Sequence, residues 1–228
     1  GALILFAMNG VPGWLLAADG GDRPSRRLFA EIPKDGMAWA SVYAGASAVA
    51  PGRIVNASAG RNRVVVGRAD DQPDERLEWL ARQLSDSGLP TQTTTAILAE
   101  AWFKLCSVVS MSSVAAMTGL TNLEICEHPE LGPLARAIVT ETVAIGGRLG
   151  ISLSADPLIR LDPKVQSRHK PSLLQDIEAG RPIEIDNTIL ALRDLARRTD
   201  APAPVLTTFA ALIEANFGGT KRHQSWKA

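Results

Sequence analysis

The chain has 228 residues, of which 46% are hydrophobic and 21% charged, a composition that suits one or two folded domains with a sizeable core. Its 24 basic residues balance 24 acidic ones, so the net charge gives no general attraction to nucleic acid or to an anionic membrane. The apolar runs fall short of the ~20 residues that cross a bilayer, and the opening residues lack the basic segment of a signal peptide. We therefore expect a cytoplasmic protein that binds neither nucleic acid nor membrane.

Two cysteines, Cys106 and Cys126, lie in apolar segments that are typical of helices. They lack the short spacing of metal-binding or redox pairs, so we expect two buried thiols in a reducing compartment. The three histidines, His128, His169 and His223, are too scattered to indicate a metal site. The sequence therefore predicts no metal ion.

The chain opens with an apolar run, Ala2–Ala7, which is typical of a buried strand and ends at Met8-Asn9-Gly10. A buried strand of a parallel sheet has neighbours on both sides. The chain also does not begin with Met. From these two observations we expect that an upstream segment is absent from the sequence.

The rest of the first third is typical of short strands followed by one helix. Pro51-Gly52 is a strong turn signal, and Arg63–Gly67 carries the β-branched run of a strand. Apolar residues at helical spacing then predict a helix over Pro73–Ser87. Either Asp70 or Asp71 is expected to serve as its N-cap.

From about Thr95 onwards the apolar spacing is helical. We expect helices over Ile97–Met117, Leu131–Leu149, Leu173–Ala179, Asn187–Arg198 and Pro204–Asn216. The first of these is apolar on most of its faces, which is typical of a helix at the centre of a bundle. Glu130 and Glu141 are expected to face solvent, and the polar tail Gly218–Ala228 is expected to be loose.

Lys104 is unusual because it lies in the run Trp102-Phe103-Lys104-Leu105-Cys106 of the long apolar helix. Burying an ammonium group is costly without partners, and desolvation eases the release of its proton near neutral pH, as a general acid requires. The alternative is a lysine whose charge extends into solvent along one polar edge of the helix. From this helix alone, the second interpretation is the better supported.

A second stretch whose residues suggest a functional site spans residues 169–186. Ser172 is placed to cap the helix that follows, Gly180 to end it, and Pro182 to give Glu184 a defined direction. A serine at a helix N-terminus suits a carboxylate or a phosphate group. A capped helix-turn-helix without any ligand explains the same residues, and on physical grounds alone it is the preferred interpretation.

Three motifs together resemble the ketopantoate reductase family. The block H-K-P-S-L-L-Q-D-I-E-A-G-R-P-I-E-I-D is similar to the family motif K-P-S-M-x-Q-D-x-x-x-x-R-x-x-E-I-D. The run W-F-K-L around Lys104 is similar to the family's W-x-K-L. Met8-Asn9-Gly10-Val11 is similar to the family's Q-N-G followed by Ile, Val or Met. The motifs keep the family's order, and the resemblance covers nearly all of the chain. It implies an α/β Rossmann-type domain, truncated at its N-terminus, over residues 1–95. An all-α domain of the 6-phosphogluconate-dehydrogenase C-terminal-like type follows over residues 96–228.

The resemblance also implies roles for individual residues. Lys104 is implied to donate a proton to a ketone oxygen as NADPH delivers hydride, and Glu184 to hold that ammonium group beside the cofactor. Asn9 is implied to contact both cofactor and substrate, and Ser172 to bind the carboxylate of the substrate. The implied reaction is the reduction of 2-dehydropantoate (ketopantoate) or a related 2-oxo acid. The apolar surface of the helical domain favours a homodimer.

Two departures from the family pattern lie on the helix of Lys104. The family usually has asparagines four and eight positions after the lysine, on one helix face, where this chain has Val108 and Ser112. The valine side chain cannot form a hydrogen bond, whereas Ser112 keeps a hydroxyl for the substrate. We therefore expect a changed substrate preference. A reductase of the same fold for another ketone, and a non-catalytic helical binding domain, remain as alternatives.

The phosphate-binding loop of the family has no counterpart in the sequence. This loop, G-x-G-x-x-G/A, occupies the first strand-helix turn of a Rossmann domain. Gly10-Val11-Pro12-Gly13 and Gly146-Gly147 both lack its spacing. We therefore expect the 228 residues alone to bind NADPH poorly and to be inactive without the absent segment.

Overall fold

The computed structural model describes residues 2–17, 29–56, 58 and 60–218. The chain divides into two compact units, Gly1–Trp102 and Phe103–Ala228. The division falls within the long helix α4 (Ile97–Thr118), so the first turn of this helix belongs to the unit that carries the sheet. His223 and most of the tail that was expected to be loose lie outside the described residues.

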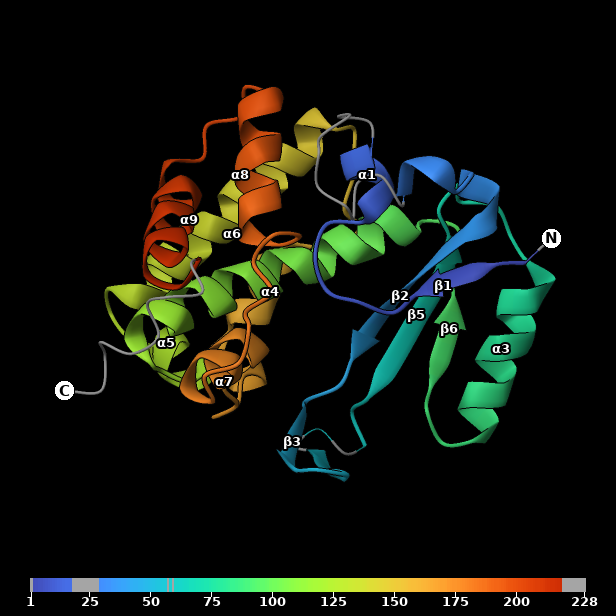
Figure 1. Ribbon diagram of the computed structural model, residues 1–228, viewed down its shortest axis with the longest axis horizontal. Helices are drawn as coiled ribbons and strands as arrows, with labels where there is room; N and C mark the ends of the chain where they lie inside the picture. The colour runs from blue at the N-terminus through green and yellow to red at the C-terminus, as the bar shows by residue number, and fades with distance from the viewer. Residues whose placement is uncertain (1, 18–28, 57, 59, 219–228) are drawn as a thin grey trace. The chain divides into compact units, whose positions relative to one another are not determined.

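The first unit holds a four-stranded sheet in the order β1-β2-β5-β6 (Figure 1). Its strands are β1 (Ile4–Phe6), β2 (Met37–Tyr43), β5 (Arg63–Arg68) and β6 (Thr91–Thr93). β1 is parallel to β2, and β6 is parallel to β5, whereas β2 and β5 are antiparallel. A separate hairpin consists of β3 (Ala46–Ala50) and β4 (Arg53–Asn56). It turns at Pro51-Gly52 as predicted, and Gly52 has a φ of 73°.

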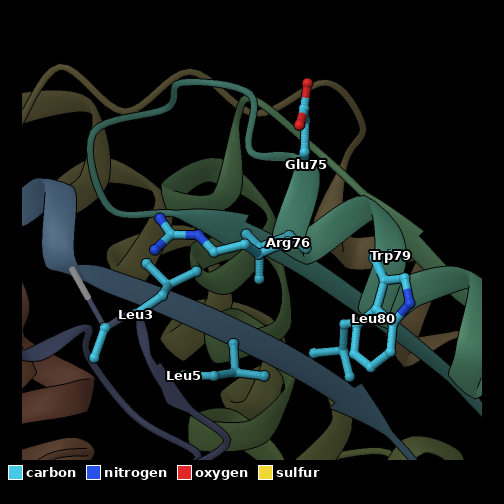
Figure 2. A pocket seen from close by; sticks show the side chains of 8 residues that line it. Leu3, Leu5, Glu75, Arg76, Trp79 and Leu80 are labelled. Atoms are coloured by element: carbon cyan, nitrogen blue, oxygen red, sulfur yellow. The ribbon is translucent and has the colours of Figure 1, made fainter.

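β1 is shorter and more exposed than the opening run predicts. Among the described residues it lies at one end of the strand order and pairs only with β2, and Ile4 is 44% exposed. In this structure the run is therefore less buried than a strand with a neighbour on each side. A groove of about 540 Å³ lies beside it. Figure 2 shows Leu3 and Leu5 on one side of this groove and Trp79 and Leu80 on the other.

Side chains of the sheet alternate between two apolar layers, because successive residues of a strand point to opposite faces. Trp39 of β2 belongs to one layer with Ile97 of α4 and with Trp14 of α1 (Gly13–Ala17). Its ring meets that of Trp14 edge-on, with centroids 5.7 Å apart. Ala40 of the same strand belongs to the other layer with Leu77 of α3 (Glu75–Asp86). Helices therefore cover both faces of the sheet, as in doubly wound α/β folds.

The N-cap of α3 differs from the prediction. The cap is Asp74, whose side chain accepts a hydrogen bond from the backbone nitrogen of Arg76 at 2.9 Å. Asp70 instead accepts a bond from Nε of Arg68 at 2.8 Å. Asp71 accepts one from the backbone nitrogen of Ile97 at 3.1 Å. Both predicted caps are wrong, because each of these carboxylates has a partner elsewhere in the fold.

The second unit is helical throughout its regular elements. Besides most of α4 it contains α5 (Asn122–Glu127), α6 (Leu131–Arg148), α7 (Ser172–Glu178), α8 (Ile189–Arg198) and α9 (Pro204–Phe217). α6 packs against α5, α8 and α9 and so forms the centre of this group (Figure 1). The predicted helices are confirmed apart from shifts at their ends, and α5 was not predicted.

Glu141 of α6 does not face solvent as expected. Its carboxylate accepts hydrogen bonds from the backbone nitrogens of Val205 at 3.0 Å and Leu206 at 2.7 Å. These amides belong to the first turn of α9, which has no side-chain cap of its own. Because the first amides of a helix lack partners within it, Glu141 satisfies two of them and joins α9 to α6.

α4 has 22 residues and is apolar enough to cross a bilayer by length and composition alone. The expectation that no run reaches this length is therefore wrong. The core helix of a soluble protein passes the same test, and 61% of the most apolar stretch of α4 is buried inside the protein. This burial agrees with the predicted helix at the centre of a bundle.

Candidate active site

A narrow, partly exposed stripe runs along α4. Between residues 104 and 116, only Lys104, Val108 and Ser112 are partly exposed, and every other residue is buried. The three positions are four residues apart, so they share one face of the helix. The helix therefore presents one lysine, one valine and one serine on this face, with Lys104 and Ser112 about 12 Å apart along the axis.

The helix around Lys104 is apolar, and the thiol and hydroxyl groups within six residues of it lie on buried residues. Trp102 and Cys106 are both fully buried, and burial raises the pKa of the Cys106 thiol to about 12. The hydroxyl of Ser107 donates to the carbonyl of Lys104 at 3.1 Å, and that of Ser110 donates to the carbonyl of Ser107 at 3.2 Å. These two hydroxyls bond to the helix backbone, so the polar groups that the stripe presents are the ammonium group of Lys104 and the hydroxyl of Ser112.

Asn9 lies in the turn that leaves the carboxyl end of β1. Its side chain is exposed, and the next residue, Gly10, is buried with a φ of 113°. The backbone nitrogen of Leu15 donates to the carbonyl of Pro12 at 3.0 Å, which leads the chain into α1. Ligands of open α/β sheets bind beyond the carboxyl ends of the parallel strands. An amide that can both donate and accept at this place fits the carboxamide of a nicotinamide ring.

The segment that precedes α7 is bonded to the start of α5. The backbone nitrogen of Asn122 donates to the carbonyl of His169 at 3.1 Å. The guanidinium group of Arg168 lies 3.1 Å from the carboxylate of Glu124. Burial lowers the pKa of His169. The first residues of the 169–186 block are therefore held on α5, which follows α4 after the turn at Gly119.

Ser172 is the first residue of α7 and not its cap. Pro171 occupies the N-cap position, and no side chain caps this end of the helix. The predicted capping role is wrong because the helix begins one residue earlier than expected. The hydroxyl group of Ser172 is on an exposed residue. Glu178 at the other end of α7 pairs with Nζ of Lys170 at 2.5 Å, which ties the helix to the residues before it.

Glu184 lies on the segment between α7 and α8, which crosses α4 in the projection of Figure 1. The predicted end of α7 is confirmed, since Gly180 follows it with a φ of 64°. Glu184 is exposed, whereas the neighbouring Ile185 is 5% exposed and anchors the segment. The hydroxyl of Thr188 donates to the carbonyl of Glu184 at 3.2 Å. The segment therefore has a defined course that leaves the Glu184 side chain accessible.

The site residues predicted from the sequence are divided between the two units. Lys104, Ser112, Ser172 and Glu184 belong to Phe103–Ala228, and Asn9 belongs to Gly1–Trp102. Within the second unit, α4 places Lys104 and Ser112 on one face.

Sequence reasoning missed one charged residue on the same face, Glu100. Its Oε1 accepts a hydrogen bond from the hydroxyl of Tyr43 at 2.6 Å. A glutamate four residues before a lysine is a recognisable helical pattern, so the sequence contained a signal for this residue.

The groove beside β1 is not part of the candidate site, because none of the five predicted site residues lines it. Among the described residues, no three His, Cys, Asp or Glu side chains gather in a group that could hold a metal ion.

The helical part of the chain matches a known family. Residues 96–216 match the family model described as the C-terminal domain of ketopantoate reductase PanE/ApbA. A relative from Mesorhizobium japonicum, named 2-dehydropantoate 2-reductase, is 31% identical over 225 residues. The alignment covers 92% of this chain and 67% of the relative. The chain thus spans about two thirds of the length of that relative.

Solved structures agree with this match. The crystal structure of 2-dehydropantoate 2-reductase from Methylococcus capsulatus has a TM-score of 0.77 at 24% identity, over 93% of this chain and 69% of that one. D-mandelate dehydrogenase in complex with NADH has a TM-score of 0.78 at 20% identity, over 95% of this chain and 70% of that one. These likenesses show the fold, a Rossmann-type α/β sheet followed by a helical domain. Together with the family model and the Mesorhizobium relative, they lead to one conclusion: the chain belongs to the ketopantoate reductase family.

Proposed function

We propose that the protein reduces a 2-oxo acid with NADPH, and that 2-dehydropantoate or a close relative of it is the substrate. The observation that carries this proposal is the position of Lys104 on the partly exposed stripe of an otherwise buried helix. Relatives named 2-dehydropantoate 2-reductase support the reaction, and the fold shared with an NADH-bound dehydrogenase supports a nicotinamide cofactor.

Lys104 is the proton donor in this proposal. A reduced nicotinamide, when bound, supplies the hydride that the carbonyl carbon of the 2-oxo acid receives. Nζ of Lys104 gives its proton to the carbonyl oxygen, so that the product is the 2-hydroxy acid. The ammonium group also stabilises the negative charge that develops on this oxygen. Because the nearby Trp102, Leu105 and Cys106 are buried, this charge interaction is screened less than in water.

Four further residues complete the proposed site. Asn9 holds the carboxamide of the cofactor and one edge of the substrate, and Glu184 holds the ammonium group of Lys104 beside the cofactor. Ser172 donates its hydroxyl to the carboxylate of the substrate, and Ser112 contacts the substrate from the same helix face as Lys104. The exposure of Asn9, Ser172 and Glu184 supports these contacts, because a ligand can reach all three side chains.

The proposal extends to the organisation of the protein. Residues 1–95 contribute to cofactor binding, and residues 96–228 bind the substrate and form a homodimer. A dimeric ketopantoate reductase from Staphylococcus aureus with the same fold supports this assembly. A reductase of small metabolites that uses a nicotinamide cofactor is expected to act in the cytoplasm.

A second candidate is a reductase of a different ketone. Val108 favours it, because this residue lies between Lys104 and Ser112 on the partly exposed stripe and offers no hydrogen bond to a polar substrate. The chemistry at Lys104 is the same in both candidates, and only the substrate differs.

Oxidation of NADPH with a panel of 2-oxo acids, followed by absorbance, tests the proposal on the protein as its gene encodes it. Lys104→Ala should lower kcat by a factor of about 10² to 10⁴, the usual contribution of a general acid. Lys164→Ala, which removes an exposed lysine from a short 3-10 turn, serves as the matched control and should keep the full rate. Equal rates for Lys104→Ala and the unaltered protein would remove Lys104 from the mechanism.

A further inference from the structure

The first turn of α4 is bonded to the sheet of its own unit at two separate points. The hydroxyl of Tyr43, at the end of β2, donates to Oε1 of Glu100 at 2.6 Å. The carboxylate of Asp71, just after β5, accepts a hydrogen bond from the backbone nitrogen of Ile97 at 3.1 Å. These bonds bridge 57 and 26 residues of chain, respectively. They fix the start of α4 on the sheet through contacts that are distant in sequence.

Three side chains from three elements meet at the first of these points. Tyr43 and Arg63 are directly opposite each other on β2 and β5, and the guanidinium carbon of Arg63 lies 4.1 Å from the centroid of the Tyr43 ring. A terminal nitrogen of Arg63 lies 3.8 Å from Oε1 of Glu100. The side chain of Glu100 is only 22% exposed. Its carboxylate therefore has a hydrogen-bond donor and a cation that limit its orientation.

The second point contains a residue in an uncommon backbone conformation. Asp71 has a φ of 58°, in the left-handed region that non-glycine residues seldom adopt. Such a conformation persists when the surrounding structure requires it. Here the Asp71 carboxylate satisfies an amide at the start of α4, one that has no partner within the helix. This bond ties the start of α4 to the residues that follow β5.

Glu100 is one helical turn before Lys104, on the same face of α4. Both residues are partly exposed and continue the stripe formed with Val108 and Ser112. A glutamate four residues before a lysine has the favourable orientation for a charge interaction along a helix. The first unit ends at Trp102, so Lys104 follows within two residues of the part of α4 that these bonds hold.

We propose that Glu100, oriented by Tyr43 and Arg63, is a positioning residue for Lys104. Its carboxylate directs the ammonium group of Lys104 towards the carbonyl oxygen of the substrate, and Tyr43 acts through Glu100. This proposal rests on the proposed function, because it assumes that Lys104 is the proton donor. A positioning residue affects the proton-transfer geometry more than substrate binding, since a misplaced donor mainly raises the barrier of the chemical step.

Steady-state kinetics of the protein as its gene encodes it test the proposal with Glu100→Gln, Tyr43→Phe and the double variant. Glu100→Gln should lower kcat about tenfold and change KM less than about twofold. Tyr43→Phe should lower kcat about threefold, the usual loss for one hydrogen bond. The double variant should match Glu100→Gln, because residues that act through one another are not additive. The isotope effect with C4-deuterated cofactor should increase in all three, because the chemical step becomes rate-limiting.

The controls separate positioning from general stability. Glu78→Gln, at an exposed position of α3 in the same unit, should leave kcat unchanged. In a Lys104→Ala background, Glu100→Gln should have no further effect on the residual rate. Unchanged kcat in Glu100→Gln, or an equal loss with and without Lys104, would overturn the proposal. If Lys104→Ala itself keeps the full rate, the proposed function fails instead, so the two failures are distinguishable.

Amide hydrogen exchange of the 228-residue chain tests, without an activity measurement, whether Tyr43 and Glu100 hold the first turn of α4. Tyr43→Phe and Glu100→Gln should speed the exchange of the backbone amides from Glu100 to Lys104 about threefold or more, because a helix start without its tertiary contacts opens more often. Glu78→Gln should leave these amides unchanged. Exchange that is the same in all three variants would show that Tyr43 does not hold this turn. That result would contradict the positioning role of Glu100.

Discussion

Lys104 can be interpreted only together with the residues around it on α4. The apolar helix alone favours a lysine that extends into solvent. The structure shows Lys104 on a narrow stripe with Val108 and Ser112, while the rest of this stretch is buried. The four-residue spacing of this stripe could be predicted from the sequence, because helical periodicity is a local property. Its isolation between buried neighbours could not be predicted, because burial depends on the packing of distant segments.

Val108 is the residue whose replacement should change substrate preference. Val108→Asn restores a side-chain amide in the middle of the stripe and should raise kcat/KM for 2-dehydropantoate about tenfold over other 2-oxo acids, because a hydrogen-bonding site rejects substrates that leave it unpaired. Turnover of the oxo-acid panel measures this ratio. Val143→Asn, at an exposed position of α6, is the matched control. An unchanged ratio would mean that position 108 does not contact the substrate.

The starts of α5 and α3 show what local sequence patterns can and cannot predict. The residues Thr121 and Glu124 form a capping box at the start of α5, and this Thr-x-x-Glu pattern is visible in the sequence. The helix was missed because its six residues are too few for a clear apolar period. The cap of α3 is a different case, because Asp70, Asp71 and Asp74 are all chemically suitable. The choice among them depends on the local pairing of Asp70 with Arg68 and on Ile97, which only the folded structure brings near to Asp71.

The cap of α3 gives a stability that depends on pH. Arg76, through its side chain and its backbone amide, holds the pKa of Asp74 well below its usual range. A carboxylate with a depressed pKa in the folded state stabilises the fold fully above its unfolded pKa of about 3.9, and this contribution is lost as pH falls towards the depressed value. Asp74→Asn keeps an N-cap acceptor but cannot titrate. The free energy of unfolding should therefore fall less steeply below about pH 4 in Asp74→Asn than in the unaltered chain.

Urea unfolding at a series of pH values checks this expectation. Asp74→Ala is the matched comparison, because it removes the cap as well as the charge and should cost about 1 kcal/mol at neutral pH. Identical acid slopes for Asp74→Asn and the unaltered chain would assign the pH dependence to other groups.

At the scale of the whole molecule, the order of strands followed by helices and the family could be predicted from the sequence. The reason is that motifs and hydrophobic periodicity depend only on the order of residues in the chain. The contacts between distant segments could not be predicted. Glu141 bonds to Val205 and Leu206 across more than 60 residues, and no local pattern distinguishes it from a solvent-facing glutamate such as Glu130. The strand order β1-β2-β5-β6 likewise depends on pairings that span the first unit.

The position of β1 at the end of this order affects how the 228-residue chain behaves in concentrated solution. Among the described residues no strand pairs with the outer edge of β1, and an apolar edge strand is a template on which another chain can add a strand. The apolar groove beside it enlarges the exposed apolar surface. We expect concentration-dependent self-association through this edge, detectable by sedimentation velocity. Ile4→Lys should weaken it about tenfold, because lysine on an edge strand opposes intermolecular pairing. Ile159→Lys, at an exposed 3-10 turn, should leave it unchanged, and equal association of both variants would place the contact elsewhere.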